Sequence, residues 1–167
     1  MPETTYDVAV IGSGPAGYTA AIRAGQYKLK TALIEKDPYL GGTCLHVGCI
    51  PTKALLFNAE LWDHLKDAKE FGIEGVASRK LNWDAVQDRK TQIVNKHAKG
   101  LEFLMRKNKV DTVRGYGKLT GPARNGVFTV EVKDGTKTSQ LTAKNIILAT
   151  GSEARMIPGL ESGDRVL

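Results

Sequence analysis

"VAVIGSGPAG", residues 8–17, joins a short apolar run to a glycine-rich turn, and this stretch decides the fold class. The apolar run, residues 6–11, carries a single charge and predicts a buried strand of a parallel sheet. An alanine-rich helical stretch follows the turn, and residues 30–35 predict a second strand. The segment therefore predicts a compact β-α-β unit, which is typical of α/β domains with a parallel sheet.

The glycine-rich turn predicts a dinucleotide-binding site because of where it lies. It follows a strand, opens a helix and precedes Glu35, which ends the next strand eighteen residues after Gly17. Gly12 permits the tight turn, Gly14 lets a pyrophosphate approach the backbone, and Gly17 lets helix and strand pack closely. We expect Glu35 to accept a hydrogen bond from a ribose hydroxyl and to disfavour NADP by repelling its 2′-phosphate. The pattern does not distinguish NAD from FAD, and a plain surface turn with an unrelated glutamate is the alternative.

The rest of the chain predicts an α/β, Rossmann-like domain with long helices and a small antiparallel hairpin. Asn82 is a candidate helix cap, and the dipeptide at 134–135, Asp-Gly, is a hairpin signal. The first long helical region is interrupted near Gly48 and Pro51. The expected elements are helices over 43–70 and 82–108 and strands over 110–116, 127–132, 139–143 and 145–150.

The composition fits one globular domain, since 41% of the 167 residues are hydrophobic and 25% are charged. The net charge of +6 is spread along the chain and suits an anionic ligand, but no nucleic-acid recognition motif accompanies it. No apolar run approaches the roughly 20 residues that cross a bilayer, so we expect no membrane segment. The first residues lack the basic and apolar regions of a secretion signal, and we expect a cytoplasmic, reducing compartment.

The only two cysteines of the chain lie five positions apart in "GGTCLHVGCIPT", residues 41–52. As zinc ligands, Cys44 and Cys49 would lack the usual C-x-x-C spacing, and we expect no metal. As plain buried thiols they would act as small hydrophobes. As a redox pair they fit a reducing compartment, where the disulfides that do form are usually catalytic or sensing. Further zinc ligands would have to come from His46, His64 or His97.

A disulfide between these cysteines requires a break in the helix that carries them. On a regular helix, residues five apart lie about 140° around the axis and roughly 8.6 Å apart, whereas bridged cysteines need Cα atoms within about 7 Å. Gly48 and Pro51 supply the means of distortion. The field at the start of a helix would also lower the pKa of the Cys44 thiol. A reactive dithiol is therefore chemically sensible, and the other two interpretations stay open.

Residues 41–53 resemble the redox-active signature of the FAD-dependent pyridine-nucleotide disulfide oxidoreductases, and with residues 54–56 they most resemble the dihydrolipoamide dehydrogenases. Glutathione and trypanothione reductases usually carry two lysines after the proline, where this chain has Thr52 and Lys53. Mercuric reductase stays a sibling alternative, because its diagnostic cysteines would lie outside this stretch. The resemblance runs from Tyr6 through 70–73, 106–110, 115–117 and 149–152, almost the whole chain.

The resemblance implies that the glycine-rich turn holds FAD, with the adenosine ribose on Glu35. It further implies that residues 36–44 continue along the cofactor, Lys53 approaches the flavin, Gly117 contacts the adenine end and residues 149–151 pass the pyrophosphate. The cofactor-binding residues expected on this basis are Gly12, Ser13, Gly14, Pro15, Ala16, Gly17, Glu35, Lys36, Gly41, Gly42, Thr43, Cys44, Cys49, Lys53, Tyr116, Gly117, Ala149, Thr150 and Gly151.

The resemblance also implies the roles of the two catalytic cysteines. Cys44 would exchange with a lipoamide-type dithiol, Cys49 would face the flavin, and electrons would pass through FAD to NAD. Members of the family form homodimers, and membership of a 2-oxo acid dehydrogenase complex is possible. The family usually has asparagine where this chain has His46, and we expect a plain packing role for this histidine.

The family continues beyond the region matched here. Its members add an NAD-binding domain, a returning segment that completes the FAD-binding domain, and a dimerisation domain. We therefore expect residues 1–151 to form an incomplete FAD-binding domain and residues 152–167 to begin the connection to an NAD-binding domain. On its own, this polypeptide is expected to bind FAD weakly and to lack the complete reaction. A non-catalytic flavin-binding or interaction module is the alternative function.

Overall fold

Within the described residues, 5–153, 155, 157–159 and 163, the computed structural model has a six-stranded sheet in the order β3-β2-β1-β6-β5-β4. The strands are β1 (Thr5–Ile11), β2 (Thr31–Glu35), β3 (Val110–Arg114), β4 (Tyr116–Leu119), β5 (Phe128–Asp134) and β6 (Lys137–Leu148). The helices are α1 (Pro15–Gln26), α2 (Gly42–His46), α3 (Cys49–His64), the short 3-10 helix η1 (Ala68–Phe71) and α4 (Trp83–Lys107). The segment expected to begin a connection, 152–167, lies mostly outside the described residues.

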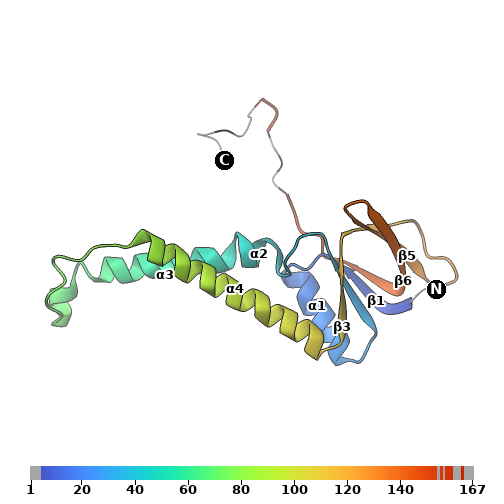
Figure 1. Cartoon of the computed structure of the whole chain (residues 1–167), viewed down its shortest axis with the longest axis horizontal. Helices are drawn as coiled ribbons and strands as arrows, with labels where there is room; N and C mark the ends of the chain where they lie inside the picture. The colour runs from blue at the N-terminus through green and yellow to red at the C-terminus, as the bar shows by residue number, and fades with distance from the viewer. Residues whose placement is uncertain (1–4, 154, 156, 160–162, 164–167) are drawn as a thin grey trace.

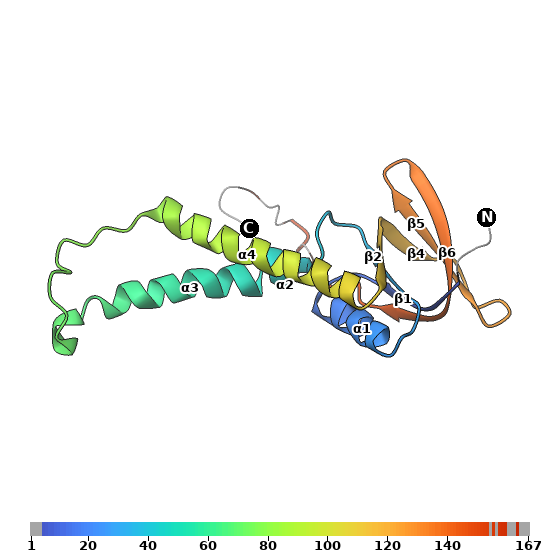
Figure 2. The same ribbon diagram turned by 60° about the horizontal axis from the view of Figure 1, so that its bottom comes forward.

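The parallel half of the sheet has β1 at its centre. β1 pairs in parallel with β2 on one side and β6 on the other, and β2 pairs in parallel with β3. The face that carries Val10 and Leu33 packs against α1 and the last turns of α4, where Met105 is fully buried (Figures 1 and 2). Both faces of β1 are covered, which explains its nearly continuous apolar sequence.

The antiparallel half of the sheet packs its inner side chains against the other face of the parallel half. β5 pairs with β6 around the turn at Gly135, and β4 pairs with β5. Val132 pairs with Ser139, so the expected hairpin and its register are confirmed. The buried residues of this second core are Tyr6, Ala9, Ile11, Ala32, Ile34, Val130, Val132, Leu141 and Ala143.

β6 belongs to both halves of the sheet. Residues 137–143 pair antiparallel with β5, while residues 142–148 pair parallel with β1. The sequence predicted two separate strands over 139–143 and 145–150, and this is wrong, because Lys144 continues the same strand. The parallel part of β6 ends at Leu148, next to the glycine-rich turn.

α3 and α4 lie side by side and extend away from the sheet (Figures 1 and 2). Arg89 of α4 joins them, since its guanidinium donates to the carbonyl of Ala54 at 3.3 Å and to Asn58 at 3.0 Å. Asn82 caps α4 by accepting from the amide of Ala85 at 3.1 Å, as predicted. The first long helix ends at His64 rather than near residue 70, because a separate 3-10 turn follows.

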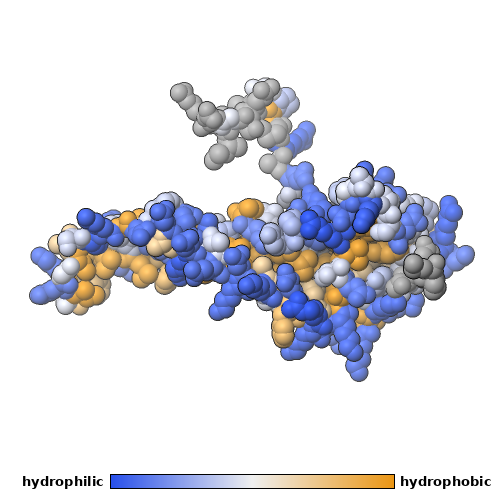
Figure 3. Space-filling model, viewed as in Figure 1, coloured by the Kyte–Doolittle hydropathy of each residue, from blue (hydrophilic) through white to orange (hydrophobic). Residues whose placement is uncertain are grey.

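Apolar side chains remain exposed on the α3–α4 pair and the chain that joins the two helices (Figure 3). Exposed fractions range from 50% to 73% at Leu56, Phe57, Leu61, Phe71, Ile73, Leu81 and Trp83. Contiguous apolar surface of this kind marks contact with further protein more often than free surface. A search of the described helices finds none with the length and hydropathy that a bilayer crossing needs.

Candidate functional site

The glycine-rich turn has the geometry that its three glycines predict. Gly12 has a φ of +99°, and a Cβ there would collide with the carbonyl of Ala149. A Cβ at Gly17 would collide with the carbonyl of Gly12, so α1 and the turn pack at backbone distance. A Cβ at Gly14 would meet nothing within 4 Å. The turn is therefore closed behind Gly12 and Gly17 and open at Gly14, where a ligand's phosphates can approach the backbone.

Two further segments meet the turn at the carboxyl end of the parallel strands. The amide of Ala149 donates to the carbonyl of Ile11 at 2.8 Å, which brings residues 149–151 beside the turn. Gly117 crosses the ends of β1 and β2, where a Cβ would lie 3.0 Å from Ile34 and 3.1 Å from Ile11. The fold therefore brings the glycine-rich turn, Gly117 and residues 149–151 to one edge of the sheet. Ligands of open α/β sheets bind at this edge.

Glu35 is buried and fully engaged with its own chain. Its Oε2 accepts from the Ser13 amide at 2.8 Å and from the Ser13 hydroxyl at 2.6 Å, and its Oε1 accepts from the Asp37 amide at 2.8 Å. Burial by itself raises the pKa of Glu35, but the hydrogen bonds from Asp37 and Ser13 outweigh burial and lower that pKa below its ordinary value. Glu35 is therefore an ionised acceptor, as a ribose-binding carboxylate needs to be.

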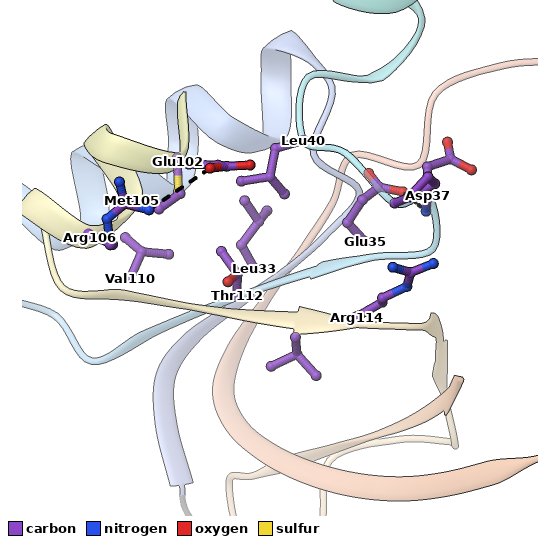
Figure 4. A pocket seen from close by; sticks show the side chains of 12 residues that line it. Leu33, Glu35, Asp37, Leu40, Glu102, Met105, Arg106, Val110, Thr112 and Arg114 are labelled. Carbon is purple, nitrogen blue, oxygen red and sulfur yellow. Dashed lines mark hydrogen bonds and ion pairs between the residues drawn. The ribbon is translucent and has the colours of Figure 1, made fainter. Parts of the chain in front are cut away.

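A cavity of about 330 Å³ lies beside Glu35, between β2, β3 and the end of α4 (Figure 4). Asp37 and Arg114 lie near Glu35 at one end, and the ion pair of Glu102 and Arg106 lies at the other, with 4.0 Å between charged atoms. Sequence reasoning missed Arg114, and it covered Asp37 only within the range 36–44. The usable signal was their position at the carboxyl ends of neighbouring parallel strands. Arg114 is the last residue of β3, and Asp37 follows the end of β2 by two residues. The apolar lining comes from Leu33, Pro38, Leu40, Met105, Val110 and Val113.

Two of the predicted cofactor residues point to the surface. The Lys36 ammonium pairs with Glu153 at 3.5 Å, with both side chains largely exposed. Tyr116 is 61% exposed at the start of β4. The structure therefore places both residues at the rim of the site, beside the buried Glu35 and the half-buried Gly117.

The cysteine-bearing segment begins directly on the glycine-rich turn. A Cβ at Gly42, the first residue of α2, would lie 2.8 Å from the Cα of Gly14. The amide of Gly41 lies 3.1 Å from the carbonyl of Ser13 and 3.2 Å from its hydroxyl, and donates to both. The glycine-rich turn and the first turn of α2 are thus in van der Waals contact.

The two cysteines lie on different helices, as a bridge between them requires. α2 ends at His46 and α3 begins at Cys49, with Gly48 between them. A Cβ at Gly48 would lie 3.3 Å from the Cα of Cys44, so the break folds the chain back onto the first cysteine. Pro51 lies inside the first turn of α3, where proline is tolerated, and it has no N–H to donate to the carbonyl of Val47, so the break falls where Pro51 prevents α2 from continuing into α3.

Cys44 and Cys49 are free thiols in this structure. A hydrogen bond to Cys49 raises the pKa of the Cys44 thiol, and the opposing effect of Lys53 is smaller. The expected lowering of the Cys44 pKa is therefore wrong for the dithiol form, because the hydrogen bond with Cys49 and burial both favour the protonated thiol. Within the described part of the chain, no three Cys, His, Asp or Glu side chains gather as metal ligands would.

His46 faces the segment before α2 rather than the sulfur atoms. Its Nε2 lies 2.9 Å from the carbonyl of Leu40, which requires a proton on this nitrogen. Its ring centroid is 5.7 Å from that of Tyr39. This position supports the packing role expected from the sequence.

A second cavity, of about 460 Å³, lies between α1, α2 and α4 and reaches Cys44. Its lining is mostly apolar, and α4 contributes His97, Leu101 and Leu104 to it. Sequence reasoning assigned Leu101 and Leu104 to the apolar face of the helix over 82–108 and weighed His97 as a zinc ligand. Their spacing of four and three residues was the available signal, since it places them on one face of the helix.

The model of the pyridine nucleotide-disulphide oxidoreductase family matches residues 6–166 of this chain. The chain belongs to that family. Dihydrolipoyl dehydrogenase of Bacillus subtilis is 49% identical to it over 162 residues, which cover 95% of this chain and 34% of that protein. Dihydrolipoyl dehydrogenase of Mycobacterium leprae is 46% identical over 160 residues, which cover 93% of this chain and 33% of that protein. The chain therefore spans about a third of the length of these curated members of the oxidoreductase family.

Two solved structures have the same fold as this chain. LpdA of Mycobacterium tuberculosis superposes with a TM-score of 0.81 over 98% of this chain and 35% of its own, at 23% identity. RclA of Escherichia coli, described as a flavoprotein disulfide reductase, superposes with a TM-score of 0.69 over 93% of this chain. The predicted fold class and the resemblance to this oxidoreductase family are confirmed. The match lies in the amino-terminal, FAD-binding part of these proteins.

Proposed function

We propose that this chain is the FAD-binding and redox-cysteine part of a dihydrolipoyl dehydrogenase, which oxidises a dihydrolipoamide dithiol and reduces NAD. The observation that carries the proposal is the contact of α2 with the phosphate-binding turn, where Gly42 meets Gly14 at backbone distance. Cys44 follows Gly42 by two residues within α2, which supports a position close to the proposed pyrophosphate site. The names of the relatives support lipoamide as the substrate class.

The residues at the carboxyl edge of the sheet fit FAD. Gly14 leaves its backbone open, and α1 begins there with an amino-terminal turn that attracts phosphate. Ionised Glu35 would accept from the adenosine ribose, and Gly117 and residues 149–151 would line the adenine and pyrophosphate. Lys53, one turn into α3, would approach the flavin from the cysteine side. When bound, FAD supplies the two-electron step between the dithiol and NAD.

The chain's own sulfur atoms would perform thiol–disulfide exchange. In the oxidised form, a substrate thiolate attacks Cys44, forms a mixed disulfide and displaces Cys49 as a thiolate. The second thiol of the substrate then loses its proton and attacks the substrate sulfur that is bonded to Cys44. The substrate leaves as a cyclic disulfide, and Cys44 is released as a thiolate. The break at Gly48 keeps the two cysteines within bridging reach throughout.

The proposal includes assembly and location. The exposed apolar side chains of the α3–α4 pair support contact with the remaining two thirds of the enzyme or with a homodimer partner. Membership of a 2-oxo acid dehydrogenase complex would follow from a lipoamide substrate. A cytoplasmic location suits a pair of thiols that must cycle.

Titration of the 167-residue chain with FAD, followed by flavin fluorescence, tests the proposal. We expect weak but saturable FAD binding, and no comparable binding of FMN, which lacks the pyrophosphate and adenosine that the turn and Glu35 would hold. Mild oxidant should join Cys44 to Cys49, as peptide mass mapping would detect, and Cys44→Ser should abolish the bridge. Absence of FAD binding, or equal binding of FMN, would contradict the nucleotide assignment. Failure of the two thiols to join would contradict the redox assignment.

A further inference from the structure

Ser13 makes contacts that a phosphate-binding turn does not require. The second position of a G-x-G-x-x-G turn needs only a side chain small enough to fit. Ser13 is fully buried, with 0% of its surface exposed, and its hydroxyl faces the protein. A buried hydroxyl needs partners, and this one has two that belong to different parts of the site.

The Ser13 hydroxyl acts as a donor and as an acceptor. It donates to Glu35 Oε2 at 2.6 Å, a charge-assisted bond, and it accepts from the Gly41 amide at 3.2 Å. Glu35 ends β2, and Gly41 immediately precedes α2. One oxygen atom therefore joins the turn, the ribose-binding carboxylate and the start of the cysteine-bearing helix.

We propose that Ser13 is a positioning residue that acts through Glu35 and Gly41 and does not itself bind the cofactor. Its hydroxyl holds the carboxylate in one orientation and holds the amide that begins the approach to α2. The part of this proposal that concerns the ribose rests on the proposed FAD function. The part that concerns the bridge from Glu35 to Gly41 stands on the geometry of this chain alone.

The charged groups around Glu35 do not depend on the Ser13 hydroxyl. Asp37 donates its amide to Glu35 and lines the same cavity as Arg114, while Lys36 is turned toward Glu153. None of these contacts involves the Ser13 hydroxyl. A change in Glu35 on substitution of Ser13 therefore reports the loss of the hydroxyl itself.

The test compares Ser13→Ala with Thr142→Val in the 167-residue chain. Thr142 is also buried, and its hydroxyl bonds Thr5 at 3.0 Å near the opposite end of β1. In Ser13→Ala we expect the pKa of Glu35, followed by carboxyl NMR, to rise by about one unit, and the Gly41 amide, which keeps its 3.1 Å bond to the Ser13 carbonyl, to exchange about threefold faster. Thr142→Val should change neither. If Ser13→Ala leaves both quantities unchanged, the positioning role is refuted.

Measuring FAD affinity separates failure of the proposed function from failure of the positioning role of Ser13. Ser13→Ala should weaken FAD binding about tenfold, and Thr142→Val should leave it within about twofold. If the unmodified chain binds no FAD, the proposed function fails, while the Glu35 and Gly41 measurements still decide the bridge. Should Ser13→Ala unfold, Ser13→Cys takes its place, because a thiol keeps a side chain of similar size with only a weak donor. Ser13→Cys should raise the pKa of Glu35 in the same direction, and an unchanged pKa would refute coupling through Glu35.

Discussion

Replacing Gly42 with alanine tests the contact on which the proposed function depends. The new Cβ would lie 2.8 Å from the Cα of Gly14 and 3.3 Å from its nitrogen, so one backbone must move. Gly42 also has a φ of +60°, where a side chain costs about 1–2 kcal/mol. Overpacking against a backbone adds about 1–3 kcal/mol. We therefore expect Gly42→Ala to lower the free energy of unfolding by about 2–5 kcal/mol.

Gly72 supplies a matched control for this substitution. It has a φ of +71°, and a Cβ there would meet nothing within 4 Å. Gly72→Ala should therefore show only the conformational cost of about 1–2 kcal/mol. Urea denaturation followed by circular dichroism measures both variants, and FAD titration should show weaker binding for Gly42→Ala alone. Equal losses of stability in the two variants would refute the packing of α2 on the turn.

Three further predictions concern single side chains. The pKa of Glu35 is lower in the folded chain than in the unfolded chain. The ionised carboxylate therefore contributes its full stability above the unfolded pKa of about 4.3, and this stability is lost as pH falls through the folded pKa. Glu35→Gln should remove this part of the difference between urea denaturation curves at pH 3 and pH 7. Asn82→Ala should cost about 1 kcal/mol by removing the cap of α4, and an unchanged urea midpoint would contradict the cap. His46→Asn should leave the pKa of the Cys44 thiol within about half a unit, since His46 faces Leu40; a larger shift in thiolate absorbance would show that the histidine acts on the cysteine pair.

Features encoded over a few residues could be predicted from the sequence. The turn at Gly12, Gly14 and Gly17, the cap at Asn82 and the hairpin turn at Gly135 each depend on local backbone conformation or a nearby hydrogen bond. The break at Gly48, just before Pro51, was predicted for the same reason.

Features that depend on distant partners were not predictable in this way. The continuity of β6 through Lys144 depends on β1 and β5 both being present, and an isolated sequence window contains neither. The raised pKa of the Cys44 thiol depends on the position that Cys49 reaches only after the chain folds back at Gly48. The contacts of the Ser13 hydroxyl join residues as far as 28 positions apart.

The place of β6 at the middle of the sheet bears on how the chain is made on the ribosome. Thr5 and Thr142 are neighbours in the sheet but 137 positions apart in the chain. One edge of β1 therefore stays unpaired until residues 142–148 have left the exit tunnel. An open strand edge recruits other chains. Newly synthesised copies should thus be most prone to aggregate just before residues 142–148 emerge, and translation stalled short of that point should leave chains that depend on chaperones.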